Sequence, residues 1–293
     1  MSVGCRAIEV TDAVQGVRVP TWLLYPAEAI ERVEPFGTYS LSVAKEAPID
    51  GDQRPLVVIS HGTGSTPWVL RDLALHLVRG GFVVALLAHP GNTRRDDSLA
   101  HTPINLINRP RHIRLVIDAA FADREIGPRL VPDAAAVIGH SLGGYTALAL
   151  AGGRPMALPH ESPDGQGHPF SVETDARVRA LVLLAPAAPW LMVEGALGAV
   201  DVPVLMRTGE KDLFSPTAFD DVLLRGFPDR TRIDYRIVLN AGHFSFLSPF
   251  PPAMVHPQFP PSQDPPGFDR AAYLLELHAE VQAFLRRQWI PTE

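Results

Sequence analysis

A serine between two glycines is the strongest candidate for a nucleophile in this chain. Gly139-His140-Ser141-Leu142-Gly143 follows an expected strand over 133–138 and begins an expected helix that ends near Ala151. At a tight turn from strand to helix, glycines two positions before and after the serine avoid steric clashes and leave its hydroxyl exposed. The pattern predicts a nucleophile elbow at Ser141. The alternative is a serine that only caps an ordinary turn.

A serine hydroxyl is a weak nucleophile at neutral pH, so it needs a base that is oriented by an acid. His243 is the preferred base because it follows the last expected strand, and His89 and His112 are second choices. Asp212 is preferred over Glu210 as the acid, since it lies further beyond the end of its strand. The order Ser, Asp, His is typical of an elbow in a parallel sheet. Asp212 is expected to fix the imidazole tautomer and to stabilise the imidazolium.

A glycine-containing turn is expected to complete the site. His61-Gly62-Thr63-Gly64 follows the apolar segment 55–60, and the backbone N–H groups of Thr63 and Leu142 are predicted to form an oxyanion hole. A phosphate-binding loop is a poor alternative, because neither G-x-G-x-x-G nor G-x-x-x-x-G-K-[ST] occurs there. No metal-binding motif such as H-E-x-x-H is present, and no cofactor is expected.

Several apolar side chains are candidates for a substrate pocket. Ala187 to Val200 follows the end of a strand, where binding segments lie in open α/β sheets. The pocket residues expected are His89, Trp190, Leu191, Met192 and Phe244. For the residues of the connector, packing in the core or in a lid is an equal alternative.

The elements that must position these residues alternate between strand and helix. Continuous apolar, β-branched runs predict buried strands, and apolar residues at helical spacing predict helices between them. Strands are expected over 6–10, 19–25, 55–60, 82–87, 133–138, 178–184, 202–208 and 231–239, with helices before Gly80, over 111–123, 142–151 and from 269 onward. Residues 26–54 are expected to be a surface excursion. This order predicts an α/β fold with a mainly parallel sheet. We expect one domain over 1–293, with long loops at about 89–110, 154–176, 187–200 and 248–267 as pocket walls or a small lid.

Composition excludes several other classes. The chain has 293 residues, 46% of them hydrophobic, and a formal net charge of −6. Without a basic stripe, this charge argues against a nucleic-acid partner. Cys5 is the only cysteine, so no intramolecular disulfide can form. Neither a signal-peptide segment nor an apolar run of membrane length is evident, and a cytoplasmic location is expected.

Four motifs in this order resemble a known family. Val58 to Ser65, Gly-His-Ser141-Leu-Gly, Gly-Glu-Lys-Asp212 and Gly-His243-Phe are similar to bacterial α/β-hydrolases of the dienelactone-hydrolase-like group, which is related to platelet-activating-factor acetylhydrolases. The resemblance covers roughly residues 19–290. It implies an α/β-hydrolase fold with an eight-stranded, mainly parallel sheet. It also implies serine hydrolase activity towards esters, with the triad and oxyanion positions assigned above.

The chain departs from this family at the nucleophile. True dienelactone hydrolases use a cysteine at the elbow, where this chain has Ser141, so lactone hydrolysis is not implied. The leading hypothesis is therefore a serine hydrolase that cleaves a small or medium carboxylic ester through an acyl-enzyme. Amide, peptide or thioester cleavage by the same residues is the first alternative. A binding protein without catalytic activity is the less favoured one.

Overall fold

The computed structural model describes residues 1–162 and 164–289, so Pro163 of the 154–176 segment and positions 290–293 lie outside the described residues. The strands are β1 (Ser2–Ile8), β2 (Thr11–Asp12), β3 (Val17–Arg18), β4 (Thr21–Ala27), β5 (Arg32–Phe36), β6 (Tyr39–Lys45), β7 (Arg54–Ser60), β8 (Val83–Leu87), β9 (Leu130–His140), β10 (Val178–Leu184), β11 (Val204–Gly209) and β12 (Ile233–Val238). The α-helices are α1 (Arg71–Arg79), α2 (Pro103–Ala122), α3 (Leu142–Leu150), α4 (Asp220–Gly226) and α5 (Arg270–Trp289). None of these helices is both long and apolar enough to cross a membrane.

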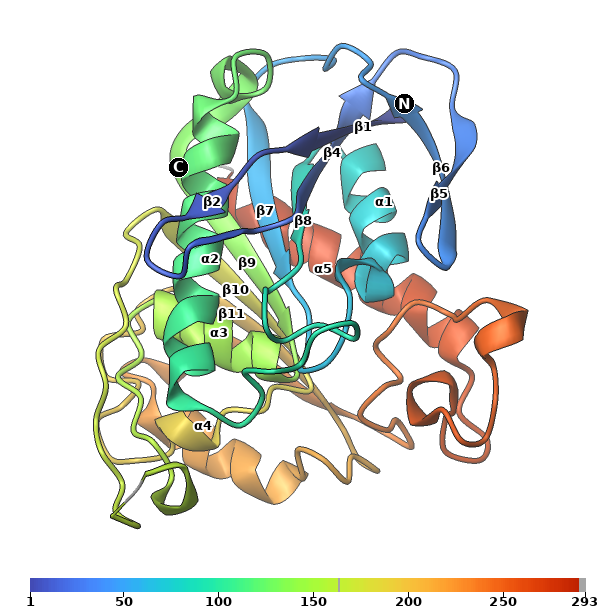
Figure 1. Cartoon of the computed structure of the whole chain (residues 1–293). Helices are drawn as coiled ribbons and strands as arrows, with labels where there is room; N and C mark the ends of the chain where they lie inside the picture. The colour runs from blue at the N-terminus through green and yellow to red at the C-terminus, as the bar shows by residue number, and fades with distance from the viewer. Residues whose placement is uncertain (163, 290–293) are drawn as a thin grey trace.

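One large sheet organises the chain (Figure 1). Its strand order is β12-β11-β10-β9-β7-β8-β4-β1-β6-β5, and β2 and β3 form a separate ribbon. The six strands from β12 to β8 are parallel to one another. In contrast, β4 is antiparallel to both β8 and β1. The expected mainly parallel α/β sheet is confirmed.

The resemblance implied eight strands, but this count is wrong, because the sheet has ten strands within the described residues. The segment 26–54 was expected to be a surface excursion, but it supplies β5 and β6. These strands pair as a hairpin that turns at Gly37, where φ is +68°. Tyr39, Leu41 and Val43 alternate with more exposed residues and are buried. This alternation is the pattern of an amphipathic strand, and the proline and charged residues around it obscured it.

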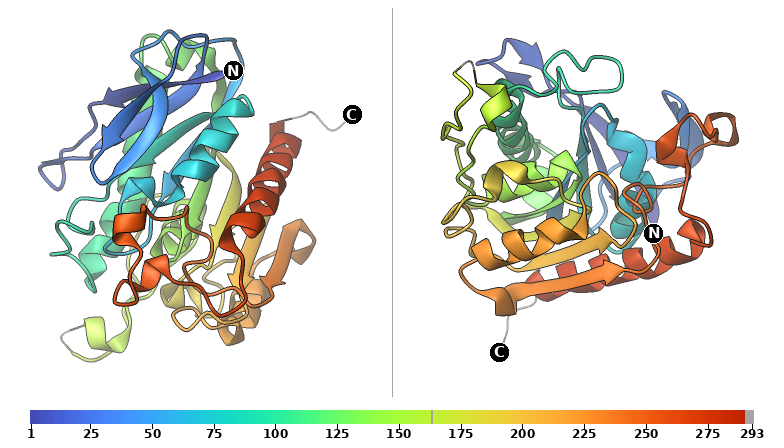
Figure 2. Two further views of the ribbon diagram at one scale, coloured as in Figure 1. Left: turned by 90° about the vertical axis from the view of Figure 1, so that its right-hand side faces the viewer. Right: turned by 90° about the horizontal axis from the view of Figure 1, so that it is seen from below.

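The core lies on both faces of the sheet. On β7, Val57 and Ile59 pack with the apolar side chains of α1 and α5. Leu56 and Val58 point to the opposite face and pack with α2 and α3. Figure 2 shows the same arrangement, with α5 on one side of the sheet and α2 and α3 on the other. Burial on both faces explains why the central strands are continuous apolar runs.

Helix α2 begins earlier than the sequence indicated, so the loop expected over 89–110 ends at Thr102. The Thr102 side chain caps the helix by accepting a hydrogen bond from the Asn105 N–H. Pro110 lies inside the helix, where it has no N–H to donate to the Leu106 carbonyl. That carbonyl instead accepts a hydrogen bond from the Tyr145 hydroxyl at 3.1 Å. A tertiary contact therefore compensates for the proline that had suggested a loop.

Candidate active site

Ser141 occupies a sharp turn between β9 and α3. Its backbone has φ 55° and ψ −122°, a conformation that is strained for a residue with a side chain. A Cβ added at Gly139 would overlap the Gly143 carbonyl, and one added at Gly143 would overlap the Ser60 carbonyl. Ser141 stands at the N-cap of α3, but its side chain makes no capping hydrogen bond. The hydroxyl is therefore free for another purpose, which disfavours the interpretation of this serine as a simple cap.

His243 and Asp212 come from loops that follow β12 and β11, the two strands at the end of the sheet. The Asp212 Oδ2 atom accepts a hydrogen bond from His243 Nδ1 at 2.7 Å. Asp212 Oδ1 accepts hydrogen bonds from the N–H groups of Phe214 and Ser215, both at 2.8 Å. Both carboxylate oxygens are thus occupied and the aspartate is fixed. With its proton on Nδ1, the imidazole of His243 has Nε2 available as a base.

A second histidine connects the elbow to the loop that carries His243. The side chain of His140, directly before Ser141, contacts the His243 carbonyl through Nε2 at 2.9 Å. Burial lowers the pKa of His140 to about 3, so its imidazole is neutral and Nε2–H donates this bond. This bond therefore ties the elbow to the loop that carries His243.

The turn after β7 packs directly against the elbow. A Cβ built on Gly62 would lie 3.1 Å from the Cβ of Ser141. In the described part of the chain, the backbone N–H groups of Thr63 and Leu142 have no hydrogen-bond acceptor. Thr63 and Ser141 line the same pocket. Two backbone N–H donors are thus free, one on the turn after β7 and one at the first residue of α3, directly after the serine.

A buried arginine supports this turn from behind. The guanidinium of Arg109 donates to Asn92 Oδ1 at 2.6 Å and also to the His61 carbonyl. Asn92 in turn donates to Thr63 Oγ1 at 2.8 Å. Burial lowers the pKa of Arg109 to about 9, so the group remains charged at neutral pH. Sequence reasoning missed Arg109, although its helical spacing from the buried Leu106 marks an inward-facing position.

A cavity of about 350 Å³, here called the Ser141 pocket, opens above these groups. Its wall includes the candidate residues Thr63, Ser141, His243 and Phe244, together with aromatic side chains that were not predicted: Tyr39, Phe214, Phe250 and Phe259. Ser215 also lines it, and the Ser215 hydroxyl has no hydrogen-bond partner among the described residues. The residues that the structure describes include no group of three His, Cys, Asp or Glu side chains placed as metal ligands.

Of the expected pocket residues, only Phe244 lines this cavity. Trp190 packs against Tyr145 and donates its indole N–H to Glu161, while Leu191 is buried and Met192 packs against the core. These three side chains of the connector therefore belong to the core, and among the connector residues only Ala187, at its start, lines the pocket. His89 is fully buried and contacts Ser60 and His112, which also removes both second-choice bases from the pocket.

Comparison with known proteins agrees with this architecture. Residues 56–291 match the model of the alpha/beta hydrolase family. A ferulic acid esterase from Streptomyces cinnamoneus superposes with a TM-score of 0.70 at 18% identity, covering 99% of this chain and 92% of that one. A dienelactone-hydrolase-like promiscuous phosphotriesterase from metagenomic libraries gives 0.60 at 15% identity, with 97% and 99% covered.

A dienelactone hydrolase from Anabaena variabilis gives a TM-score of 0.57 at 15% identity, covering 98% of this chain and 99% of that one. No curated protein matches the sequence. At these identities the solved structures establish the fold, and the family model covers well over half of the chain. The chain belongs to the alpha/beta hydrolase family.

Proposed function

We propose that this hydrolase is a serine esterase that cleaves a small or medium carboxylic ester through an acyl-enzyme. The observation that carries the proposal is the Ser141 side chain, which makes no capping hydrogen bond on a strained turn and lines the same pocket as His243, the hydrogen-bond partner of Asp212. Strain of this kind is typical of functional positions. The family, together with the ferulic acid esterase and the dienelactone hydrolase among the similar solved structures, supports the same reaction class.

In the first half of the reaction, His243 Nε2 accepts the hydroxyl proton of Ser141 as the oxygen attacks the ester carbonyl. Asp212 holds the Nδ1–H bond and stabilises the imidazolium. The negative charge that develops on the carbonyl oxygen is stabilised by the N–H groups of Thr63 and Leu142. Removal of one such donor typically costs about 3 kcal/mol of transition-state stabilisation. His243 then returns the proton to the leaving alcohol.

In the second half, a water molecule replaces the alcohol. His243 takes a proton from this water, which attacks the acyl group on Ser141. Collapse of the second tetrahedral intermediate releases the acid and restores the serine hydroxyl. The aromatic side chains around the pocket favour a substrate with an apolar acyl or alcohol group, because they remove apolar surface from water.

Labelling with a fluorophosphonate, combined with turnover of 4-nitrophenyl esters, tests the proposal. We expect one adduct on the wild-type protein, and neither adduct nor turnover in Ser141→Ala. Ser215→Ala is the matched control, because it removes another hydroxyl from the same pocket and should still be labelled. Unchanged turnover in Ser141→Ala would refute the proposal.

Asp212→Asn tests the role of the acid separately. The amide can still accept the N–H bonds of Phe214 and Ser215, but it cannot stabilise the imidazolium. We expect kcat to fall by about 10³–10⁴-fold while the melting temperature changes little. Matched esters, thioesters and amides then measure the leaving-group preference, and the proposal expects the highest kcat/KM with esters.

A further inference from the structure

A second, larger cavity adjoins the Ser141 pocket. It has a volume of about 900 Å³ and lies between the N-terminal strands, the start of the segment after β7 and the loop after β8. The two cavities share Tyr39, Ser65, Thr66 and Arg94 as lining residues. A ligand in the larger cavity would therefore border directly on the Ser141 pocket. Its volume lies within the range of sites for small molecules.

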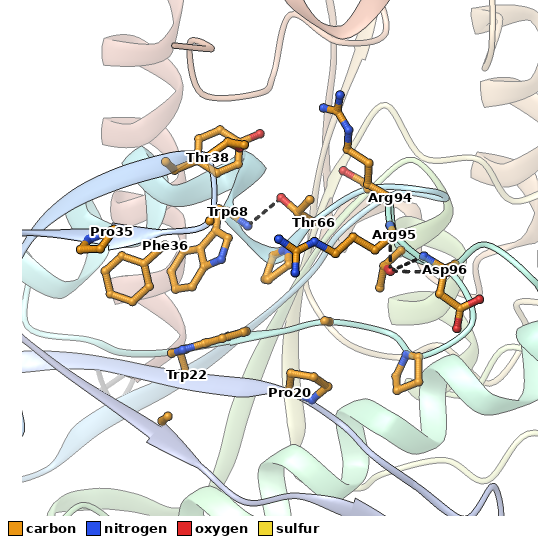
Figure 3. Close-up of a pocket in the computed structure, with 18 of the residues that line it drawn as sticks. Pro20, Trp22, Pro35, Phe36, Thr38, Thr66, Trp68, Arg94, Arg95 and Asp96 are labelled. Carbon is orange, nitrogen blue, oxygen red and sulfur yellow. Dashed lines mark hydrogen bonds between the residues drawn. The ribbon is translucent and has the colours of Figure 1, made fainter. Parts of the chain in front are cut away.

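One wall of this cavity is aromatic (Figure 3). The rings of Trp22 and Trp68 have centroids 4.9 Å apart, and those of Phe36 and Trp68 are 4.4 Å apart. Phe36 and Trp68 are buried, but Trp22 is only partly buried and can present its indole to the cavity. Such a wall favours a planar aromatic group, which can stack on an indole or meet it edge to face.

The opposite wall carries two arginines. In Figure 3 the Arg95 side chain extends from its loop toward the aromatic wall at Trp68, whereas the Arg94 side chain points away from that wall. Arg94 lies over the ring of Phe259, which lines the Ser141 pocket, at 4.8 Å. Within residues 1–162 and 164–289, neither arginine forms an ion pair. Both guanidinium groups are thus available to an anion.

The other charged side chains of the cavity are mostly engaged. Lys45 pairs with Glu34 at 2.5 Å, and Arg18 with Glu9 at 3.6 Å. Glu46 is held by Arg6 at 2.9 Å. Asp96 is an exposed carboxylate on the same loop as the arginines, and it accepts a hydrogen bond from the N–H of Ser98. Free charge in the cavity is therefore mainly positive, next to the aromatic wall.

We propose that this chamber, formed by Trp22, Phe36, Trp68, Arg94 and Arg95, binds a planar aromatic group with an acidic substituent. The ring packs against the aromatic wall, and the acidic substituent pairs with the two guanidinium groups. Because the chamber borders the Ser141 pocket and shares four lining residues with it, the bound group is the part of the substrate remote from the ester bond. The assignment of the bound group to the ester substrate rests on the proposed esterase function, whereas binding of the group to the chamber does not.

Binding is tested by calorimetry on Ser141→Ala protein, which separates it from catalysis. The probes are 2-naphthoate and the neutral 2-naphthalenemethanol. We expect the carboxylate to bind at least about tenfold more tightly, and Arg94→Gln/Arg95→Gln to abolish this difference. Arg225→Gln, an exposed arginine on α4, is the matched control and should retain it. Equal affinities for both probes, or a difference that persists in the double variant, would overturn the proposal.

The same preference should appear in turnover by the otherwise wild-type protein. We expect kcat/KM to be about tenfold higher for 6-acetoxy-2-naphthoate than for 2-naphthyl acetate, and this ratio to approach one in Arg94→Gln/Arg95→Gln. Equal rates for both esters would contradict the chamber assignment and leave the esterase proposal intact. If neither ester is cleaved, the esterase proposal fails, while calorimetry still decides whether the chamber binds the anion.

Discussion

The strained backbone of Ser141 predicts that removing its side chain can stabilise the protein. At φ 55° and ψ −122° a residue with a Cβ is under strain that typically costs about 1–3 kcal/mol. Ser141→Gly relieves this strain but loses about 0.5–1 kcal/mol through the greater entropy of glycine in the unfolded chain. Ser141→Ala keeps the Cβ and therefore the strain. We expect Ser141→Gly to exceed Ser141→Ala by about 1 kcal/mol in free energy of unfolding.

Urea unfolding and thermal melting of the two variants measure this difference. Since both lack the hydroxyl, both should be inactive, and the comparison isolates the backbone. We expect the melting temperature of the glycine variant to be higher by about 2–4 °C. Ser40 is the control: it lies exposed in β6 without a positive φ, so Ser40→Gly should be less stable than Ser40→Ala. If Ser141→Gly is no more stable than Ser141→Ala, the backbone at this position does not destabilise a residue with a Cβ, and the prediction of a strained elbow is wrong.

Two further predictions concern the buried polar groups around the site. Asn92→Ala removes the hydrogen bond that positions Thr63, so kcat for ester turnover should fall by about tenfold while KM changes little. An unchanged kcat with a KM about tenfold higher would contradict this prediction. Burial lowers the pKa values of His61, His112 and His140 to about 3, so the unfolded chain binds more protons below its own histidine pKa of about 6.5. These three groups alone therefore lower the free energy of unfolding as the pH falls, by about 4 kcal/mol between pH 7.5 and 5.5. Urea unfolding at the two pH values measures the loss, and equal stability would contradict it.

The sheet and the grouping of the main candidate residues could be predicted from the sequence because they depend on local patterns. Continuous apolar runs specify strands buried on both faces, as in β7 and β9. The carboxyl ends of parallel strands meet at one edge, so the loops that carry Ser141, Asp212 and His243 could be expected near one another. Their order along the chain, Ser, Asp and His, is also typical of a catalytic triad that begins at a nucleophile elbow.

The walls of the pocket could not be predicted, because they depend on how irregular segments fold over the sheet. Trp190 and Phe244 are both aromatic residues after strands, yet only Phe244 reaches the Ser141 pocket. Phe36 lies in a segment whose proline and charges hid a strand, and it lines the larger cavity. Pro110 likewise suggested a loop, because the hydroxyl of Tyr145 that compensates for it lies 35 positions away in the sequence.

The most direct test of the acyl-enzyme mechanism is to locate the covalent intermediate. The wild-type protein is mixed with 4-nitrophenyl acetate, quenched with acid within the first turnover, digested and analysed by mass spectrometry. The proposed mechanism predicts a single acetyl group on Ser141, formed far more slowly in His243→Ala. An acetyl group on another residue, or turnover of the ester with no acyl-enzyme and no dependence on His243, would contradict it.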